Sequence, residues 1–155
     1  MVGHRHADSL LRAPALPSRR MDPADRLELH ELPGRYGDCI DGRDWEGLAR
    51  IFTDDAVFDL TDLGVPLLEG LPAIQRFMDV DAAHPLSHLM TNIYADETPD
   101  GVRLHSRIVA MREDRRIDSG KYHDVVVKTP DGWRISHRRF LLLRRPKAKG
   151  DPTQR

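Results

Sequence analysis

The chain has only one cysteine, Cys39, among its 155 residues, so it forms no disulfide within itself. It also has little net charge, because 24 lysines and arginines face 25 aspartates and glutamates, for a formal charge of −1. A near-neutral chain lacks the basic surface that nucleic acids require, so we expect no nucleic-acid partner. No apolar run reaches the roughly 20 residues that span a bilayer, so we expect no membrane partner. A reducing, cytoplasmic location is the default expectation.

Several motifs with known chemistry are missing as well. The sequence has no HExxH, no CxxC and no helical histidine pair at i, i+4, so we expect no metal site. It has no GxGxxG or Walker loop for a nucleotide and no GxSxG elbow for a serine hydrolase. Any chemistry in this chain is therefore expected to be acid–base work by its own side chains, without a cofactor.

The chain does contain enough apolar material for one folded domain, with 39% hydrophobic against 32% charged residues. Residues 1–20 are basic, contain prolines and lack a repeating apolar face, so we predict a disordered leader. We place the domain at 21–145 and a disordered tail at 146–155. Met21 precedes a good helix start, and whether Met1 or Met21 begins the natural chain stays open.

Three helices are predicted in the first half of the chain. The first runs from Pro23 to about Ile40, capped by Asp22, with apolar residues at helical spacing and a kink or break near Pro33. The second spans 44–52 around Trp45, and the third spans 70–80. A short strand over 56–60 lies between the second and third helices.

The second half of the chain shows strand patterns throughout. We predict long strands over 86–95, 102–112, 117–128 and 133–143, separated by short turns. Helices first and a strand meander after them predict an α+β fold. In this fold a curved antiparallel or mixed sheet, wrapped by the three helices, forms a cone around one cavity.

One stretch carries a family resemblance. Gly34–Phe52 reads GRYGDCIDGRDWEGLARIF, in which Tyr36 is followed after four residues by Asp41-Gly42 and then by Trp45. This spacing resembles the opening of the SnoaL-like branch of the nuclear-transport-factor-2-like superfamily, which holds or adjoins scytalone dehydratase and the bile-acid 7α-dehydratases. The resemblance extends from about residue 22 to 143. It implies the same cone-shaped fold.

The resemblance also implies catalytic residues. In these dehydratases an aspartate after the first helix pairs with a histidine on the first long strand, and the matching positions here are Asp41 and His88. Such a carboxylate fixes the imidazole tautomer and raises its basicity, so that the ring can move a proton. Tyr36 matches the helix tyrosine, whose phenol can donate to a carbonyl or an enolate. Each residue also has a structural alternative, as core, turn or strand packing.

Strand periodicity suggests further cavity residues. His88 and Asn92 share one strand face, and on the third long strand either Tyr122 or His123 faces the cavity. Phe58 and Phe77 are expected to shape the pocket. The expected substrate-binding residues are therefore Phe58, Phe77, Asn92, Tyr122 and His123.

The resemblance implies a cofactor-free lyase or isomerase of the dehydratase type. Its substrate would be a small cyclic hydroxy-ketone, a steroid or a polyketide-like ring. One departure from the family is that its further strand aspartate aligns near Ile108 or Val109, where no acid lies. The alternatives are a protein that binds a small ligand without turnover and an interaction module.

The resemblance also implies a homodimer across the convex sheet face, with contributions from Ile135, Leu141 and Leu143. The arginines near the C-terminus, Arg138 among them, are expected to be solvated.

Overall fold

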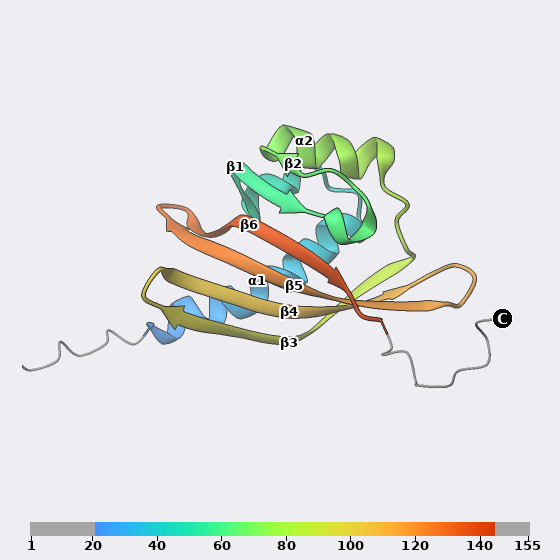
Figure 1. The fold of residues 1–155 in the computed structure, drawn as a ribbon. Coiled ribbons are helices and arrows are strands. Elements are labelled where there is room, and N and C mark those ends of the chain that lie inside the picture. The colour runs from blue at the N-terminus through green and yellow to red at the C-terminus, as the bar shows by residue number, and fades with distance from the viewer. Residues whose placement is uncertain (1–20, 145–155) are drawn as a thin grey trace, which may run out of the picture.

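The computed structural model describes residues 21–144, so the predicted leader and tail lie outside the described residues. One six-stranded sheet, in the order β2-β1-β6-β5-β4-β3, curves along helix α1 (Pro23–Asp41), while helix α2 (Leu71–Arg76) lies at the β1 end (Figure 1). The predicted α+β fold with a curved mixed sheet is confirmed. Among residues 21–144, no helix is long and apolar enough to cross a membrane.

Helix α1 forms as its sequence predicts. Asp22 caps it by accepting a hydrogen bond of 2.8 Å from the backbone nitrogen of Ala24. Its apolar stripe, which includes Leu29 and Ile40, is buried against the sheet. The helix continues through Pro33, so the predicted break does not occur. Pro33 is itself buried, and packing of this face offsets the backbone hydrogen bond that proline removes.

The second helix is shorter than predicted, whereas the third has about its predicted length and changes from α to π geometry along the way. The second is a 3₁₀ turn, η1 (Glu46–Arg50), and Asp44, two residues before it, accepts a hydrogen bond from the Gly47 backbone nitrogen at 2.8 Å. Strand β1 (Phe52–Asp59) starts at once because Phe52 pairs with the last strand, a partner that no local pattern reveals. After α2 the chain forms a π-helical turn, η3 (Phe77–Asp81).

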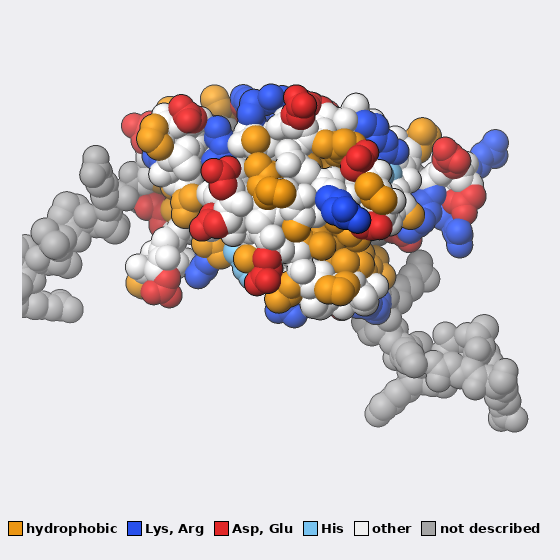
Figure 2. Space-filling view, turned by 90° about the horizontal axis from the view of Figure 1, so that it is seen from above, with side chains coloured by type: hydrophobic (Ala, Val, Ile, Leu, Met, Phe, Trp, Pro, Cys, Tyr) orange, Lys and Arg blue, Asp and Glu red, His pale blue; other side chains and the backbone are white. Residues whose placement is uncertain are grey.

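The four predicted long strands are confirmed. They are β3 (Ser87–Thr98), β4 (Gly101–Met111), β5 (Ile117–Thr129) and β6 (Gly132–Leu142), each antiparallel to the next. Strand β1 pairs in parallel with β6. The segment between β1 and α2 holds the short turn η2 (Thr61–Leu63) and the two-residue strand β2 (Leu68–Glu69), which pairs with β1. Figure 2 shows the face that carries α2 and β1, where acidic and basic side chains are interspersed.

Two bulges change which side chains face the interior. In β3, Thr91 pairs with β4 before the bulge and Tyr94 after it, and Asn92 between them has a left-handed φ of 51°. In β6, the pairing with β5 shifts between Ile135 and His137. A bulge adds one residue, so every side chain beyond it changes face. The faces predicted from uninterrupted alternation are therefore wrong beyond each bulge.

The bulge in β6 turns Arg138 into the core. Its side chain and that of Asp124 on β5 are both 0% exposed. Two parallel hydrogen bonds join them, from Nε to Oδ1 at 2.9 Å and from Nη2 to Oδ2 at 2.7 Å. Burial opposes the charge of Arg138, but Asp124 outweighs it and keeps the pKa of Arg138 above its usual value. The expectation that Arg138 is solvated is wrong, because a buried acid lies on the neighbouring strand.

Ile135 is also buried at 0% exposure, before the bulge. It therefore packs in the core and contributes nothing to the convex face, contrary to the interface residues expected from the sequence. Leu143 is exposed.

We predict that Asp124→Ala destabilises the fold by about 3–5 kcal/mol, because it leaves the Arg138 charge buried without a partner. Urea unfolding followed by circular dichroism measures the change. Asp114→Ala is the matched control, since Asp114 pairs with Arg116 on the surface and its loss should change stability little. Equal stability of the two variants would contradict the prediction.

Candidate functional site

A cavity of about 380 Å³ opens between the inner face of the sheet, the end of α1 and the segment after α2. Most of its wall is apolar. Gly120 on β5 leaves space for the ring of Phe140, because a Cβ at this position would lie 2.2 Å from that ring. The apolar lining residues include Ile40, Phe58, Leu60, Leu63, Phe77, Met78, Ile108, Phe140 and Leu142. The polar side chains on the wall are those of Tyr36, Asp81, His84, His88, Arg112, Asp118, Ser119 and Tyr122.

Asp41 and His88 are in direct contact. Helix α1 ends at Asp41, and its Oδ1 lies 2.5 Å from Nδ1 of His88, near the start of β3. The other carboxylate oxygen accepts hydrogen bonds from the His88 backbone nitrogen at 2.9 Å and from the Ser87 hydroxyl at 3.1 Å. The His88 ring lines the cavity with its side chain 8% exposed. Asp41 thus holds the ring from behind, and Nε2 is left for the cavity.

The bonds to Asp41 also set its charge. Partial burial disfavours the carboxylate, but the hydrogen bonds from the His88 ring, the His88 backbone and Ser87 outweigh burial and lower the pKa of Asp41. An ionised Asp41 accepts a hydrogen bond from the Nδ1–H of His88, which fixes His88 as the tautomer whose Nε2 carries a lone pair. That arrangement is suited to taking a proton from a molecule in the cavity.

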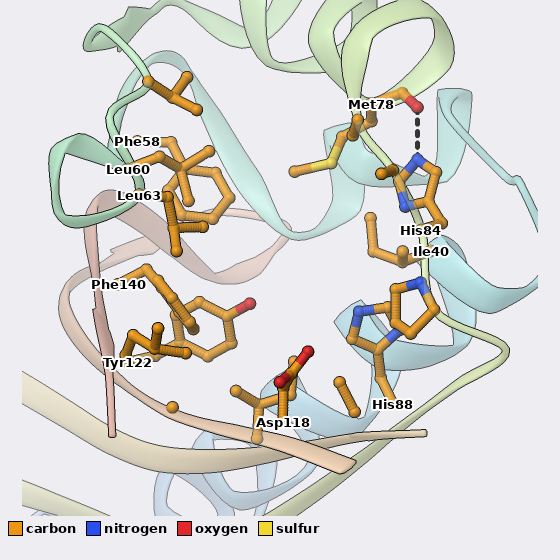
Figure 3. A pocket seen from close by; sticks show the side chains of 18 of the residues that line it. Ile40, Phe58, Leu60, Leu63, Met78, His84, His88, Asp118, Tyr122 and Phe140 are labelled. Carbon is orange, nitrogen blue, oxygen red and sulfur yellow. Dashed lines mark hydrogen bonds between the residues drawn. The ribbon is translucent and has the colours of Figure 1, made fainter. Parts of the chain in front are cut away.

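Two tyrosines stand at the opposite wall. The rings of Tyr36 on α1 and Tyr122 on β5 meet edge to face, with centroids 5.7 Å apart, and the Arg138 guanidinium carbon lies 4.2 Å from each centroid. Burial raises the pKa of both phenols, and the Arg138 charge opposes this shift. Both hydroxyls therefore keep their protons near neutral pH. Figure 3 shows the Tyr122 oxygen directed into the cavity, across from His88.

The structure places six of the eight residues predicted for the site together. Tyr36, His88, Phe58, Phe77 and Tyr122 line the cavity, and Asp41 contacts His88.

The other two predicted residues lie outside the cavity. Asn92 is exposed at the β3 bulge, so its expected place on the His88 face is wrong. His123 is exposed on the outer face of β5, where its ring meets that of His105 with centroids 5.0 Å apart. Of the two alternatives left open for this strand, Tyr122 is the inward one.

Sequence reasoning missed five of the eight polar residues on the wall, which are Asp81, His84, Arg112, Asp118 and Ser119. His84 stacks on Trp45, with ring centroids 5.3 Å apart, and its Nε2 lies 2.5 Å from the Met78 carbonyl oxygen. Arg112 and Asp118 lie at the ends of β4 and β5. Extending the Tyr122 face of β5 backwards by two-residue steps would have found Asp118, whereas no sequence signal marks His84.

Comparisons with known proteins agree with this fold. The chain matches the model of the SnoaL-like domain family over residues 22–139. The uncharacterized protein Rv2910c of Mycobacterium tuberculosis is 32% identical, over 74% of this chain and 83% of the relative.

Two solved structures from Novosphingobium aromaticivorans have the same fold. A candidate aromatic ring hydroxylase superposes with a TM-score of 0.68 at 24% identity, covering 81% of this chain and 93% of that one. A candidate scytalone dehydratase gives 0.63 at 20% identity, covering 76% and 83%. At these identities, both matches show the fold alone.

We predict that Asp41→Asn lowers stability by about 1 kcal/mol at pH 7, because hydrogen bonds to an ionised carboxylate are lost. The folded-state pKa of Asp41 lies below the ordinary 3.8, so its contribution is fully present above pH 3.8 and is lost as the pH falls through the lower folded value. Urea unfolding at pH 7, 5 and 3 should show the difference between parent and variant shrinking toward acid. The exposed Asp38→Asn serves as control, and a pH-independent Asp41 effect would contradict this account.

Proposed function

The chain belongs to the SnoaL-like domain family, and from that premise we propose that it is an acid–base enzyme of the lyase or isomerase type. Its substrate class is a small cyclic hydroxy-ketone, of the kind that dehydratases convert to an enone and water. The observation that carries the proposal is the contact of 2.5 Å between Asp41 and a His88 ring that lines an apolar cavity.

The proton transfers follow from the position of His88. Nε2 takes a proton from the carbon next to the substrate carbonyl, and the electron pair of that C–H bond forms the enolate. The enolate then reforms its carbonyl and expels the hydroxyl on the next carbon, which leaves with the proton from Nε2 as water. Asp41 stays ionised throughout and stabilises the imidazolium between the two steps.

The tyrosines supply the complementary part. A phenol that keeps its proton can donate a hydrogen bond to the carbonyl oxygen, and the bond strengthens as that oxygen becomes negative. Tyr36 and Tyr122 both line the cavity, and the ion pair of Arg138 and Asp124 lies behind their rings. In this mechanism His88 is the base that takes and returns the proton, and the tyrosines donate hydrogen bonds to the oxyanion.

The cavity limits the size of the substrate. Its volume of about 380 Å³ lies near the lower end of the 300–1,000 Å³ typical of small-molecule pockets. We therefore favour a substrate of one or two fused rings over a four-ring steroid. The aromatic and aliphatic walls suit a flat, apolar ring system.

Binding without turnover is the second candidate, and a specific observation favours it. The further strand aspartate that family dehydratases use aligns at Ile108 or Val109, and Ile108 forms part of the apolar wall. A cavity with fewer acids can hold a ligand and leave it unchanged. The two candidates share the same cavity and differ in whether His88 moves a proton.

Hydrogen exchange separates the two candidates without knowledge of the natural substrate. We predict that the protein catalyses exchange of the protons next to the carbonyl of α-tetralone, a bicyclic ketone, in D₂O, followed by proton NMR. His88→Ala should slow the exchange by about 10²- to 10⁴-fold, the range of a positioned acid–base group.

His123→Ala is the matched control, since it removes an exposed histidine from the outer face of the sheet, and its exchange rate should equal that of the parent. Exchange at the same rate in His88→Ala and the parent would overturn the proposed function. Binding of α-tetralone with no exchange above the solvent rate would leave the second candidate.

A further inference from the structure

The proposed mechanism leaves several polar side chains of the cavity wall unused, and Asp118 is one of them. Asp118, near the start of β5, directs its carboxylate into the cavity, between the Tyr122 hydroxyl and the His88 ring (Figure 3). Its position follows from strand register. His88 pairs with Ala110, and Ala110 pairs with Asp118, so all three side chains point to the same face of the sheet.

Register also gives the separation of the two polar groups. Neighbouring strands lie about 4.7–4.9 Å apart, so two steps place the Cα atoms of His88 and Asp118 about 10 Å from each other. The imidazole and the carboxylate therefore start from separate points of the same sheet face, and both reach the cavity.

Arg112 determines what Asp118 can bind. Its Nε donates to Oδ2 of Asp118, and both side chains are partly exposed at the cavity wall, by 47% and 42%. The pair is neutral overall, so it provides no net attraction for an anion. The carboxylate still has lone pairs to accept a hydrogen bond from a neutral donor. An anionic ligand would have to displace Asp118 from Arg112 and remain next to its charge.

We infer that Asp118, held by Arg112, forms a hydroxyl-binding subsite, so that the molecule in this cavity carries a neutral hydroxyl on the part of its ring system that meets Asp118. This inference deepens the proposed function, because it names the substrate class as hydroxylated bicyclic ketones. Asp118 acts in substrate selection and takes no part in the proton transfer.

Three probes test the subsite by isothermal titration calorimetry at pH 7. They are α-tetralone, the same ketone with a hydroxyl on its aromatic ring, and the same ketone with a carboxylate there. The parent should bind the hydroxylated ketone about tenfold more tightly than α-tetralone, the effect of one hydrogen bond to a charged group, and should bind the carboxylate most weakly.

Substitutions identify the residue responsible. Asp118→Ala should abolish the preference for the hydroxyl and, because it leaves Arg112 without its carboxylate, should make the carboxylate probe the tightest of the three. Arg112→Gln is a second variant, which should keep the hydroxyl preference and weaken the carboxylate probe further. Asp114→Ala is the matched control, since Asp114 pairs with Arg116 in the same hairpin outside the cavity lining.

The outcomes separate this inference from the proposed function. A parent that fails to bind the hydroxylated ketone more tightly than α-tetralone overturns the subsite, as does a preference that survives in Asp118→Ala. The same binding ratios in a His88→Ala background support it, because selection does not depend on turnover. If the protein does not catalyse hydrogen exchange but binds the three probes with the expected ratios, the proposed enzyme activity is wrong and the subsite is still supported.

Discussion

The buried ion pair of Arg138 and Asp124 is the interaction on which the inner face of this protein depends. It joins two central strands, and its guanidinium lies between the rings of Tyr36 and Tyr122. A charge at 0% exposure is tolerated only with a partner of opposite charge and good hydrogen-bond geometry, and the two parallel bonds supply both. Because Tyr36 comes from the helix and the other three residues from the sheet, the cluster fixes how α1 sits on the sheet. The position of the two phenols at the cavity wall is a consequence.

The cavity combines this fixed wall with a second, independent anchor at the end of α1. Asp41 accepts three hydrogen bonds from Ser87 and His88, so it both ties the start of β3 to the helix and orients the imidazole. One carboxylate therefore has a structural role and, in the proposed mechanism, a chemical one, and the same hydrogen bonds serve both. The proposed base, His88, and the proposed hydrogen-bond donors, Tyr36 and Tyr122, reach the cavity from different elements.

Membership of the SnoaL-like family is consistent with this arrangement and does not by itself assign an activity, because one fold supports many functions. The cavity wall of this chain combines the apolar side chain of Ile108 on β4 with the ion pair of Asp118 and Arg112. The particular side chains on this wall, and not the fold, decide which molecules the cavity can accept.

The sequence by itself determined the elements that rest on local signals. The cap and apolar stripe of α1 and the four long strands are readable from spacing, because helical and strand periods place side chains on predictable faces. The set of Tyr36, Asp41 and His88 was indicated by the resemblance of Gly34–Phe52 to a known family. Only the tertiary structure decided which faces point inward beyond a bulge, since one extra residue reverses the alternation and nothing in the local pattern announces it. That single effect moved Asn92 out of the cavity and Arg138 into the core. The tertiary structure also decided which charged side chains meet. Asp124 and Arg138 lie on different strands, and only the folded sheet brings them together.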